Sequence, residues 1–250
     1  MTFSICASID GRHGAAIATH AIAVGSTAPF VSRHGAVCTQ AMTNTPLGVR
    51  SIDRMRRGES VDEAISTLLA RDEHAAMRQV HGIDADGHTV THTGAECEPY
   101  AGDTYGGSNT SGERDTSGET YTVAGNMIDG EAVIAAVAAA FEDAADATLD
   151  RRLLAALRAG EEAGGDKRGP HAQSAALVVF DPERPRIEHD LRVDEHEDAV
   201  TELERVHEAA ATAGADWMAE YPELNLQRSP ALEAGVDDEN GSDDPDGKGP

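Results

Sequence analysis

Residues 2–19 read Thr-Phe-Ser-Ile-Cys-Ala-Ser-Ile-Asp-Gly-Arg-His-Gly-Ala-Ala-Ile-Ala-Thr, and this stretch decides the fold. Residues 2–9 are apolar or small, which predicts a buried strand. Asp10 and Gly11 are a hairpin turn signal, and residues 13–19 predict a second strand of small residues. The chain is therefore expected to open with a buried hairpin.

Outward from this hairpin, pairs of strands alternate with pairs of helices. Further strands are expected at 35–41, 76–84, 88–93, 121–124, 173–180 and 186–193. Helices are expected at 47–57, 61–71, 130–143, 149–163 and 197–213, and Ser60 with Glu63 forms a capping box before the second of these. The polar stretch 101–120 has no apolar period and predicts a surface loop. This order of elements predicts a layered α/β fold.

The organisation along the chain favours one domain. The 250 residues are enough to bury a proper core, and no internal repeat or linker divides them. We expect a single domain over residues 1–228. Residues 229–250 hold acidic residues, Gly and Pro with almost nothing to bury, which predicts a disordered acidic tail.

The charge balance is strongly acidic. Asp and Glu number 45 against 20 Lys and Arg, which gives a net charge of −25, and Lys167 and Lys248 are the only lysines. Such a composition predicts adaptation to high salt, where ions screen the self-repulsion. Phosphate binding needs a basic face, so the charge argues against nucleic acid and against an anionic membrane surface as partners.

Three features of the sequence predict the compartment. The first residues lack the basic and apolar regions of a signal peptide. No run approaches the roughly 20 apolar residues of a membrane span. The three cysteines, Cys6, Cys38 and Cys97, are odd in number and far apart, which suits a reducing cytosol. We therefore expect a cytoplasmic protein.

An ordered set of short motifs resembles one known family. The set includes Ala36-Val37-Cys38-Thr39-Gln40-Ala41, Gly125-Asn126-Met127 and Gly164-Gly165-Asp166-Lys167-Arg168-Gly169 among blocks that span roughly residues 2–200. In this order the blocks resemble the family called domain of unknown function 1028, here in a haloarchaeal-type member. The resemblance implies an αββα sandwich similar to N-terminal-nucleophile hydrolases, and it implies no known reaction. Thr19-His20 departs from the family, which more often has Ser-Lys or a similar pair there.

Thr2 is the first candidate catalytic residue. Removal of Met1 is favoured by a small second residue and would give Thr2 a free α-amine. This amine has a pKa of about 7.7–8.0 in model compounds, so part of it can act as a base near neutral pH. It could accept the proton of the Thr2 hydroxyl, which would attack a carbonyl carbon. The alternative is that Thr2 is an ordinary second residue, because a start of Met-Thr is common.

Two further residues could assist this chemistry. Ser4 shares a strand face with Thr2 and could orient the amine or the substrate, although it could equally be a core-facing serine. Asn126 lies at a strand-to-helix junction and could donate to an oxyanion. It could also cap the helix that begins near Gly130 or hold a turn.

Two polar groups are candidates for substrate binding. Thr39, Gln40 and Asn44 gather at a strand end, where they could bind substrate or cap the helix at 47. Asp166 could position an amine and Arg168 suits a carboxylate, although a polar loop such as 164–169 is often simply solvated.

The eleven histidines show no metal-binding spacing. His88 and His92 flank a strand rather than sharing a helix face, and neither a Cys-x-x-Cys nor a His-Glu-x-x-His motif occurs. We therefore expect neither a metal site nor a cofactor.

The leading hypothesis is a C–N hydrolase that acts on a small amide or peptide-like molecule through Thr2. The alternative is a non-catalytic protein that binds a small molecule on the same fold. Self-association into a homo-oligomer is expected of this architecture.

Overall fold

The initial hairpin lies near the centre of a six-stranded sheet. The computed structural model describes residues 2–107, 118–183 and 186–220, with side chains described as far as residue 213. The sheet has the strand order β10-β9-β2-β1-β8-β7, and every neighbouring pair is antiparallel. Its strands are β1 (Thr2–Ile9), β2 (Arg12–Thr19), β7 (Ala101–Gly107), β8 (Thr120–Asn126), β9 (Ser174–Asp181) and β10 (Arg186–Val193).

A second, four-stranded antiparallel sheet has the order β3-β4-β5-β6. Its strands are β3 (Pro29–Ser32), β4 (Gly35–Ala41), β5 (Arg78–Asp84) and β6 (Thr89–Thr93). The two sheets meet through a small cluster that includes Cys6 and Ala15 of the first sheet and Ala36 and Cys38 of the second. Small side chains at these positions let the facing strands approach closely.

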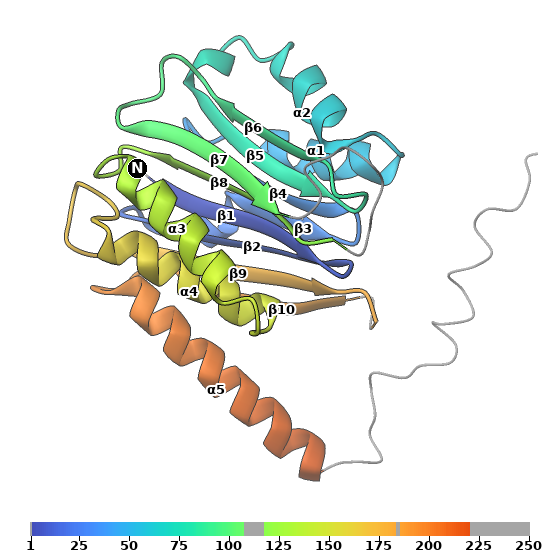
Figure 1. Cartoon of the computed structure of the whole chain (residues 1–250), viewed down its shortest axis with the longest axis vertical. Coiled ribbons are helices and arrows are strands. Elements are labelled where there is room, and N and C mark those ends of the chain that lie inside the picture. Colours follow the sequence, from blue (N-terminus) through green and yellow to red (C-terminus); the bar gives the residue numbers. More distant parts are fainter. Residues whose placement is uncertain (1, 108–117, 184–185, 221–250) are drawn as a thin grey trace, which may run out of the picture. The chain divides into compact units, whose positions relative to one another are not determined.

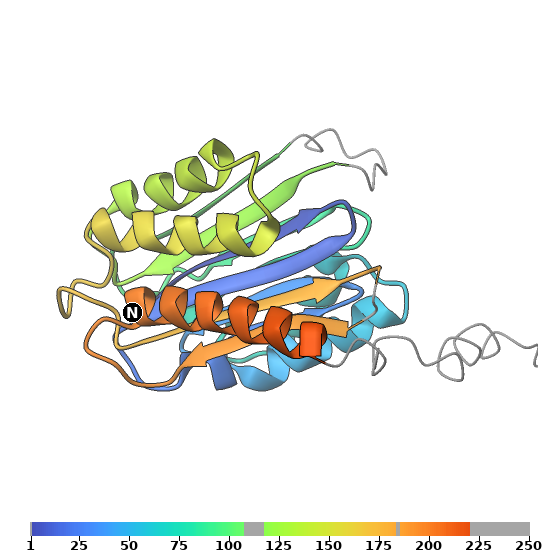
Figure 2. The same ribbon diagram turned by 90° about the horizontal axis from the view of Figure 1, so that it is seen from below.

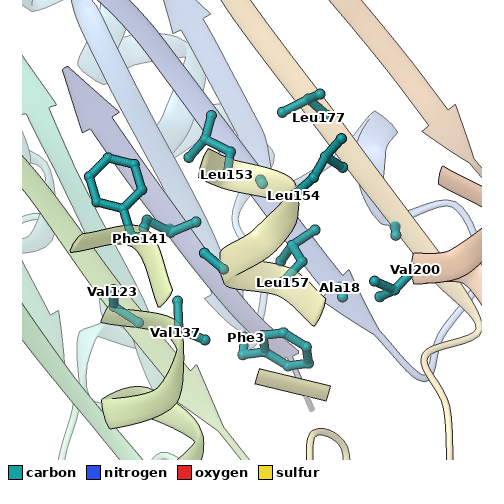
Figure 3. Close-up of a cluster of buried hydrophobic side chains, with 14 of the residues drawn as sticks. Phe3, Ala18, Val123, Val137, Phe141, Leu153, Leu154, Leu157, Leu177 and Val200 are labelled. Carbon is teal, nitrogen blue, oxygen red and sulfur yellow. The ribbon is translucent and has the colours of Figure 1, made fainter. Parts of the chain in front are cut away.

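Two helices cover the six-stranded sheet on the side away from the other sheet (Figures 1 and 2). They are α3 (Glu131–Asp143) and α4 (Leu149–Glu162). The largest hydrophobic core lies between these helices and the sheet, and it includes Phe3, Val137 and Leu157 (Figure 3). Gly160 brings α4 close to β1, because a Cβ there would lie 2.6 Å from Val137 Cγ2 and 2.8 Å from Phe3 Cε2. The strand that begins with Thr2 is therefore held firmly from this side.

The outer face of the four-stranded sheet is covered by α1 (Thr45–Arg56) and α2 (Val61–Leu69) (Figure 1). The capping box expected of Ser60 and Glu63 is confirmed at the start of α2, where both reciprocal hydrogen bonds form.

Short 3₁₀ turns occupy Val24–Ser26 and Ala75–Met77. The last described helix is α5 (Ala199–Glu220), whose first half packs on the main core through Ala199, Val200 and Leu203.

The prediction of a mixed α/β architecture is confirmed. The described residues form a mixed α+β fold with two antiparallel sheets and five α-helices. Residues up to Glu208 form one compact unit. None of the described helices is long and apolar enough to cross a membrane. The tail expected at 229–250 lies outside the described residues, as do residues 221–228 of the expected domain.

Two strands were not predicted from the sequence. The expected loop at 101–120 is wrong for residues 101–107, which form β7, and for Thr120, where β8 begins. An edge strand whose residues are only half-buried needs no apolar alternation, so β7 carries no pattern. Residues 108–117 of that loop lie outside the described residues. Strand β3 was also missed, because it is short and begins at a proline, which an edge strand tolerates.

Candidate functional site

Thr2 begins β1 between two neighbouring strands. It lies opposite Thr19 on β2 and opposite Asn126 on β8. The Thr2 hydroxyl donates to Thr19 Oγ1 over 3.1 Å, and only 8% of the residue is exposed. Directly opposed residues on paired strands have Cβ atoms about 5 Å apart. The structure therefore places Thr2 beside Asn126 at one end of the central strands.

A chain of hydrogen bonds runs between the two sheets from Ser4. The Ser4 hydroxyl donates to Gln40 Oε1 over 2.7 Å and lies 2.7 Å from His81 Nε2. The other ring nitrogen of His81 lies 2.8 Å from Thr122 Oγ1. Because the single Ser4 proton goes to Gln40, His81 Nε2–H donates to Ser4 and its Nδ1 accepts from Thr122. Every bond in this chain thus has a fixed direction.

Gln79 connects this chain to Asn126. Its Oε1 accepts from Gln40 Nε2 over 2.8 Å and from Asn126 Nδ2 over 3.0 Å. Its own amide nitrogen lies within hydrogen-bonding distance of three oxygens, which share its two hydrogens: Thr93 Oγ1, Gly102 O and Gly125 O. Gln79 is completely buried, so these bonds hold it in one orientation. That orientation in turn fixes the amide of Asn126.

Asn126 is an amide donor and not a helix cap. Gly130 is the N-cap of α3, so the capping alternative for Asn126 does not occur. The contact with Gln79 uses one of the two hydrogens on Asn126 Nδ2. Asn126 also lines a pocket, and 1% of the residue is exposed.

The pocket has a volume of about 230 Å³ and opens at the ends of β4 and β8. Its lining consists of Ala41, Met42, Met77, Glu96, Cys97, Glu98, Asn126 and Met127. Two of these residues have left-handed backbone conformations, with φ of 67° at Ala41 and 55° at Met127. Such conformations cost non-glycine residues roughly 1 kcal/mol or more and concentrate at functional sites. Thr2 does not line the pocket itself and adjoins it through Asn126.

The loop that contains Asp166 lies at the same end of the sheet. Asp166 Oδ2 accepts from the backbone N–H of His20, the residue after Thr19, over 2.7 Å. Arg168 donates to both oxygens of this buried carboxylate, so the two predicted binding residues pair with each other. A backbone bridge joins Asp166 to Ile128, two residues beyond Asn126. Asp166 therefore ties the loop to the strand ends around Thr2.

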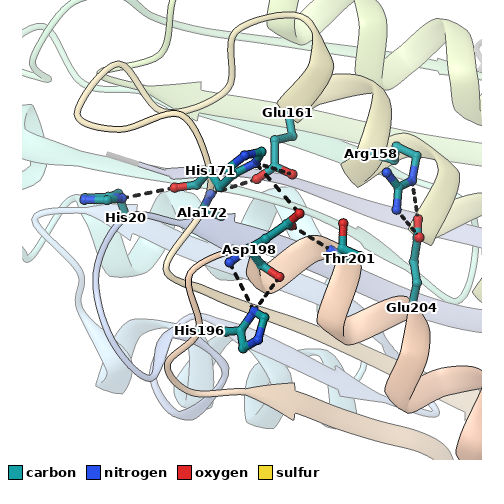
Figure 4. Close-up of polar contacts among 9 residues, drawn as sticks. All are labelled: His20, Arg158, Glu161, His171, Ala172, His196, Asp198, Thr201 and Glu204. Carbon is teal, nitrogen blue, oxygen red and sulfur yellow. Dashed lines mark hydrogen bonds and ion pairs between the residues drawn. The ribbon is translucent and has the colours of Figure 1, made fainter.

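A second polar cluster anchors the end of this loop (Figure 4). Glu161 accepts from the backbone N–H of Ala172 over 2.7 Å, and burial raises the pKa of its carboxyl group. The exposed His171 lies 3.7 Å from Glu161 and 4.0 Å from Asp198, and its carbonyl oxygen lies 3.1 Å from His20 Nδ1. The cluster links the end of α4 to the start of α5.

Thr39 and Asn44 lie outside this site. Asn44 is the N-cap of α1, as the helix-capping alternative predicted, and its Oδ1 accepts from the backbone N–H of Leu47. Its Nδ2 donates to Asp72. Thr39 has the same orientation along β4 as Val37, which packs against α1 and α2. Its buried hydroxyl has no hydrogen-bond partner among the described residues. Of the predicted cluster at this strand end, only Gln40 faces Ser4.

Two buried cysteines extend the polar layer further along β1. Cys6 Sγ lies 3.5 Å from Cys38 Sγ, and both residues are fully buried. The hydrogen bond from Cys6 lowers the pKa of Cys38, whereas burial raises it. Burial raises the pKa of Cys6.

The sequence predicts four of the residues around this site, namely Thr2, Ser4, Gln40 and Asn126. In the structure Thr2 lies opposite Asn126, Ser4 bonds to Gln40, and Gln79 links Gln40 to Asn126. The sequence does not predict Gln79, His81 and Thr122 as members of the same network. The one available signal was strand alternation, because Gln79 and His81 are polar positions two residues apart on β5. Alternation alone could not show that they face the other sheet.

Comparison with known proteins places the chain in a family. The chain is similar to the crystal structure of protein SPO2555 from Silicibacter pomeroyi, with 31% sequence identity and a TM-score of 0.73. The description of that structure names the family model DUF1028. The match covers 86% of this chain and 92% of that one. No curated protein matches the chain. The model of the family of unknown function DUF1028 matches residues 2–203, and the chain belongs to this family.

Proposed function

We propose that this protein is an N-terminal-nucleophile hydrolase that cleaves a small amide or peptide-like substrate through Thr2. The observation that carries the proposal is the position of Thr2 as the first residue of a central strand, beside an asparagine that lines a pocket. Helices on the outer faces of two facing antiparallel sheets resemble the αββα layering of such hydrolases. The ordered motifs of the family add to this resemblance.

The proposed reaction proceeds through an ester on Thr2. After removal of Met1, the α-amine of Thr2 accepts the hydroxyl proton while Oγ1 bonds to the substrate carbonyl carbon. The second hydrogen on Asn126 Nδ2 stabilises the negative charge that develops on the carbonyl oxygen. The C–N bond then breaks, and the leaving amine takes the proton from the α-amine. Water hydrolyses the ester and restores Thr2.

The pocket indicates the kind of substrate. Its small volume suits a compact molecule, and its three methionines offer an adaptable apolar surface. Two carboxylates, those of Glu96 and Glu98, also line it and disfavour an anionic group. The proposed substrate is therefore a small, neutral or cationic amide.

The test is turnover of a panel of small amides by Thr2→Ala and Thr2→Ser. Thr2→Ser keeps a hydroxyl and should retain activity, whereas Thr2→Ala should lose it with little change in the unfolding temperature. An active Thr2→Ala variant would contradict the proposal.

The second candidate is a binding protein without catalysis. His20 occupies a position where a lysine is more common in the family. Its ring nitrogen Nδ1 lies 3.1 Å from the carbonyl oxygen of His171. No ammonium group therefore comes from this position to support a nucleophile at Thr2. Stoichiometric binding of an amide that is never cleaved would favour this second function.

We further propose that the acidic composition reflects life in high salt, as in a haloarchaeal-type cytoplasmic protein.

A further inference from the structure

A second group of reactive side chains lies away from Thr2, where three elements meet. His207 Nε2 lies 2.5 Å from Asp150 Oδ2, and His189 Nε2 lies 3.9 Å from the same oxygen. One ligand-type atom from each of the three residues lies within 4.8 Å of the other two. Asp150 comes from the first turn of α4, His189 from β10 and His207 from α5.

The local structure aims both imidazoles at this point. A register shift in the pairing of β10 with β9 falls between Ile187 and His189, and such bulges redirect side chains. His207 lies one turn beyond the buried Leu203 of α5, so it extends the apolar stripe of that helix. A histidine in such a position needs a polar partner, and Asp150 supplies it.

We propose that Asp150, His189 and His207 form a binding site for a divalent transition-metal ion. Two imidazole nitrogens and one carboxylate oxygen are a donor set for Zn²⁺, Co²⁺, Ni²⁺, Cu²⁺ or Fe²⁺, whereas Mg²⁺ and Ca²⁺ favour oxygen ligands alone. In a tetrahedral site the ligand atoms lie about 3.4 Å apart, given metal–ligand distances near 2.1 Å. The present separations of 2.5 and 3.9 Å bracket that value, so shifts of under about 1 Å are sufficient.

The site is partly open to water. The side chains of His189 and Asp150 are 18% and 16% exposed, which leaves water access to complete the coordination.

Two other ligand-type groups in the described part of the chain fit a metal less well. Cys6, Cys38 and His81 are completely buried, and both ring nitrogens of His81 already bond to hydroxyls. Glu161, His171 and Asp198 offer one nitrogen only, and His171 is 47% exposed. Among the three groups found in the described residues, the Asp150 site combines two nitrogens with partial access to water.

The test is a titration of chelator-treated protein with Co²⁺, followed by visible absorption and then by competition with Zn²⁺. We expect one Co²⁺ per chain and an affinity at least about tenfold weaker in His189→Gln. His189 makes only a long contact to Asp150, so His189→Gln should leave the unfolding temperature of the metal-free protein unchanged. His171→Asn and Cys6→Ala are controls that should bind like the wild type.

Wild-type protein that binds no Co²⁺ would overturn the proposal, as would binding that survives His189→Gln or is lost in a control variant. If a variant fails to fold, crystals of wild-type protein soaked in Co²⁺ decide the question. An anomalous peak among Asp150, His189 and His207 supports the site, and a peak elsewhere or none rejects it.

Discussion

At the scale of single residues, the space between the two sheets holds polar side chains that satisfy one another. Five of these side chains are at most 1% exposed, and each has a hydrogen-bond partner: Ser4, Gln40, Gln79, His81 and Asn126. An unpaired buried polar group costs about 1–3 kcal/mol, so each member of this network keeps the others in place. A network of this kind can hold Asn126 in a set orientation without any ligand.

His13 gives a prediction about pH. Burial lowers the pKa of His13 to about 4 from an ordinary 6.5, so the folded protein resists its protonation. As the pH falls from 6.5 towards 4, the unfolded chain binds a proton that the folded chain does not, and stability is lost. The full effect is on the order of 3 kcal/mol in the free energy of unfolding. Urea unfolding between pH 4 and 7.5 measures it.

The variant His13→Gln cannot take up this proton. Its free energy of unfolding should therefore fall less steeply over the same pH range. His74→Gln, at an exposed histidine, serves as the matched control and should keep the wild-type slope. A wild-type slope in His13→Gln would show that other groups cause the acid sensitivity.

Some site residues could be predicted from the sequence because they need only local rules. Strand alternation places Thr2 and Ser4 on one face of β1, and the ordered motifs single out Gln40 and Asn126. Gln79 and His81 could not be assigned, since their roles depend on which sheet β5 faces. No sequence spacing predicts the group of Asp150, His189 and His207, because these residues lie far apart in the chain and converge only in the fold.

At the scale of elements, a buried arginine joins α4 to α3 and β8. Arg152 is 1% exposed and lies 4.1 Å above the ring of Phe141. Its guanidinium donates to the carbonyl oxygen of Phe141, near the end of α3, over 2.8 and 3.0 Å. It also pairs with Glu119, just before β8. One side chain thus satisfies a helix-end carbonyl and an acidic residue together.

Replacing this arginine should destabilise the fold strongly. Arg152→Met keeps much of the volume but leaves the buried Phe141 carbonyl without its donor and removes the ion pair with Glu119, so we expect a loss of about 2–4 kcal/mol. Arg152→Lys should not restore stability, because an ammonium lacks the planar fork that reaches both partners. Chemical denaturation measures both variants.

The neighbouring Arg151→Met is the control for this experiment. Arg151 is exposed on the same helix, and its replacement should change stability by less than about 0.5 kcal/mol. Equal effects at the two positions would mean that Arg152 contributes only helix propensity.

Elements with strong local signals were predicted well. The hairpin β1–β2 is fixed by Asp10-Gly11, and α2 by its capping box. Strands β3 and β7 lack such signals because each is an edge strand, stabilised by a single neighbour in its sheet. These strands are stabilised by pairing with a neighbouring strand and by packing contacts, which no local sequence pattern predicts.

At the scale of the whole molecule, the net charge of −25 predicts a dependence on salt. Added ions screen repulsion among the acidic side chains, which weakens the folded state more than the expanded chain. The midpoint of thermal unfolding should therefore rise as KCl increases from about 0.1 M to 2 M. A protein of similar size with near-zero net charge, measured alongside, corrects for general effects of salt. An unchanged or falling midpoint would contradict adaptation to salt.

The central claim concerns Thr2, and intact-mass measurement tests it most directly. Protein purified in molar KCl is weighed before and after exposure to a β-lactone that acylates N-terminal threonine, with Thr2→Ala treated in parallel. We expect that Met1 is absent, that one adduct forms on Thr2, and that Thr2→Ala forms none. Retained Met1, or an adduct that persists in Thr2→Ala, would contradict it.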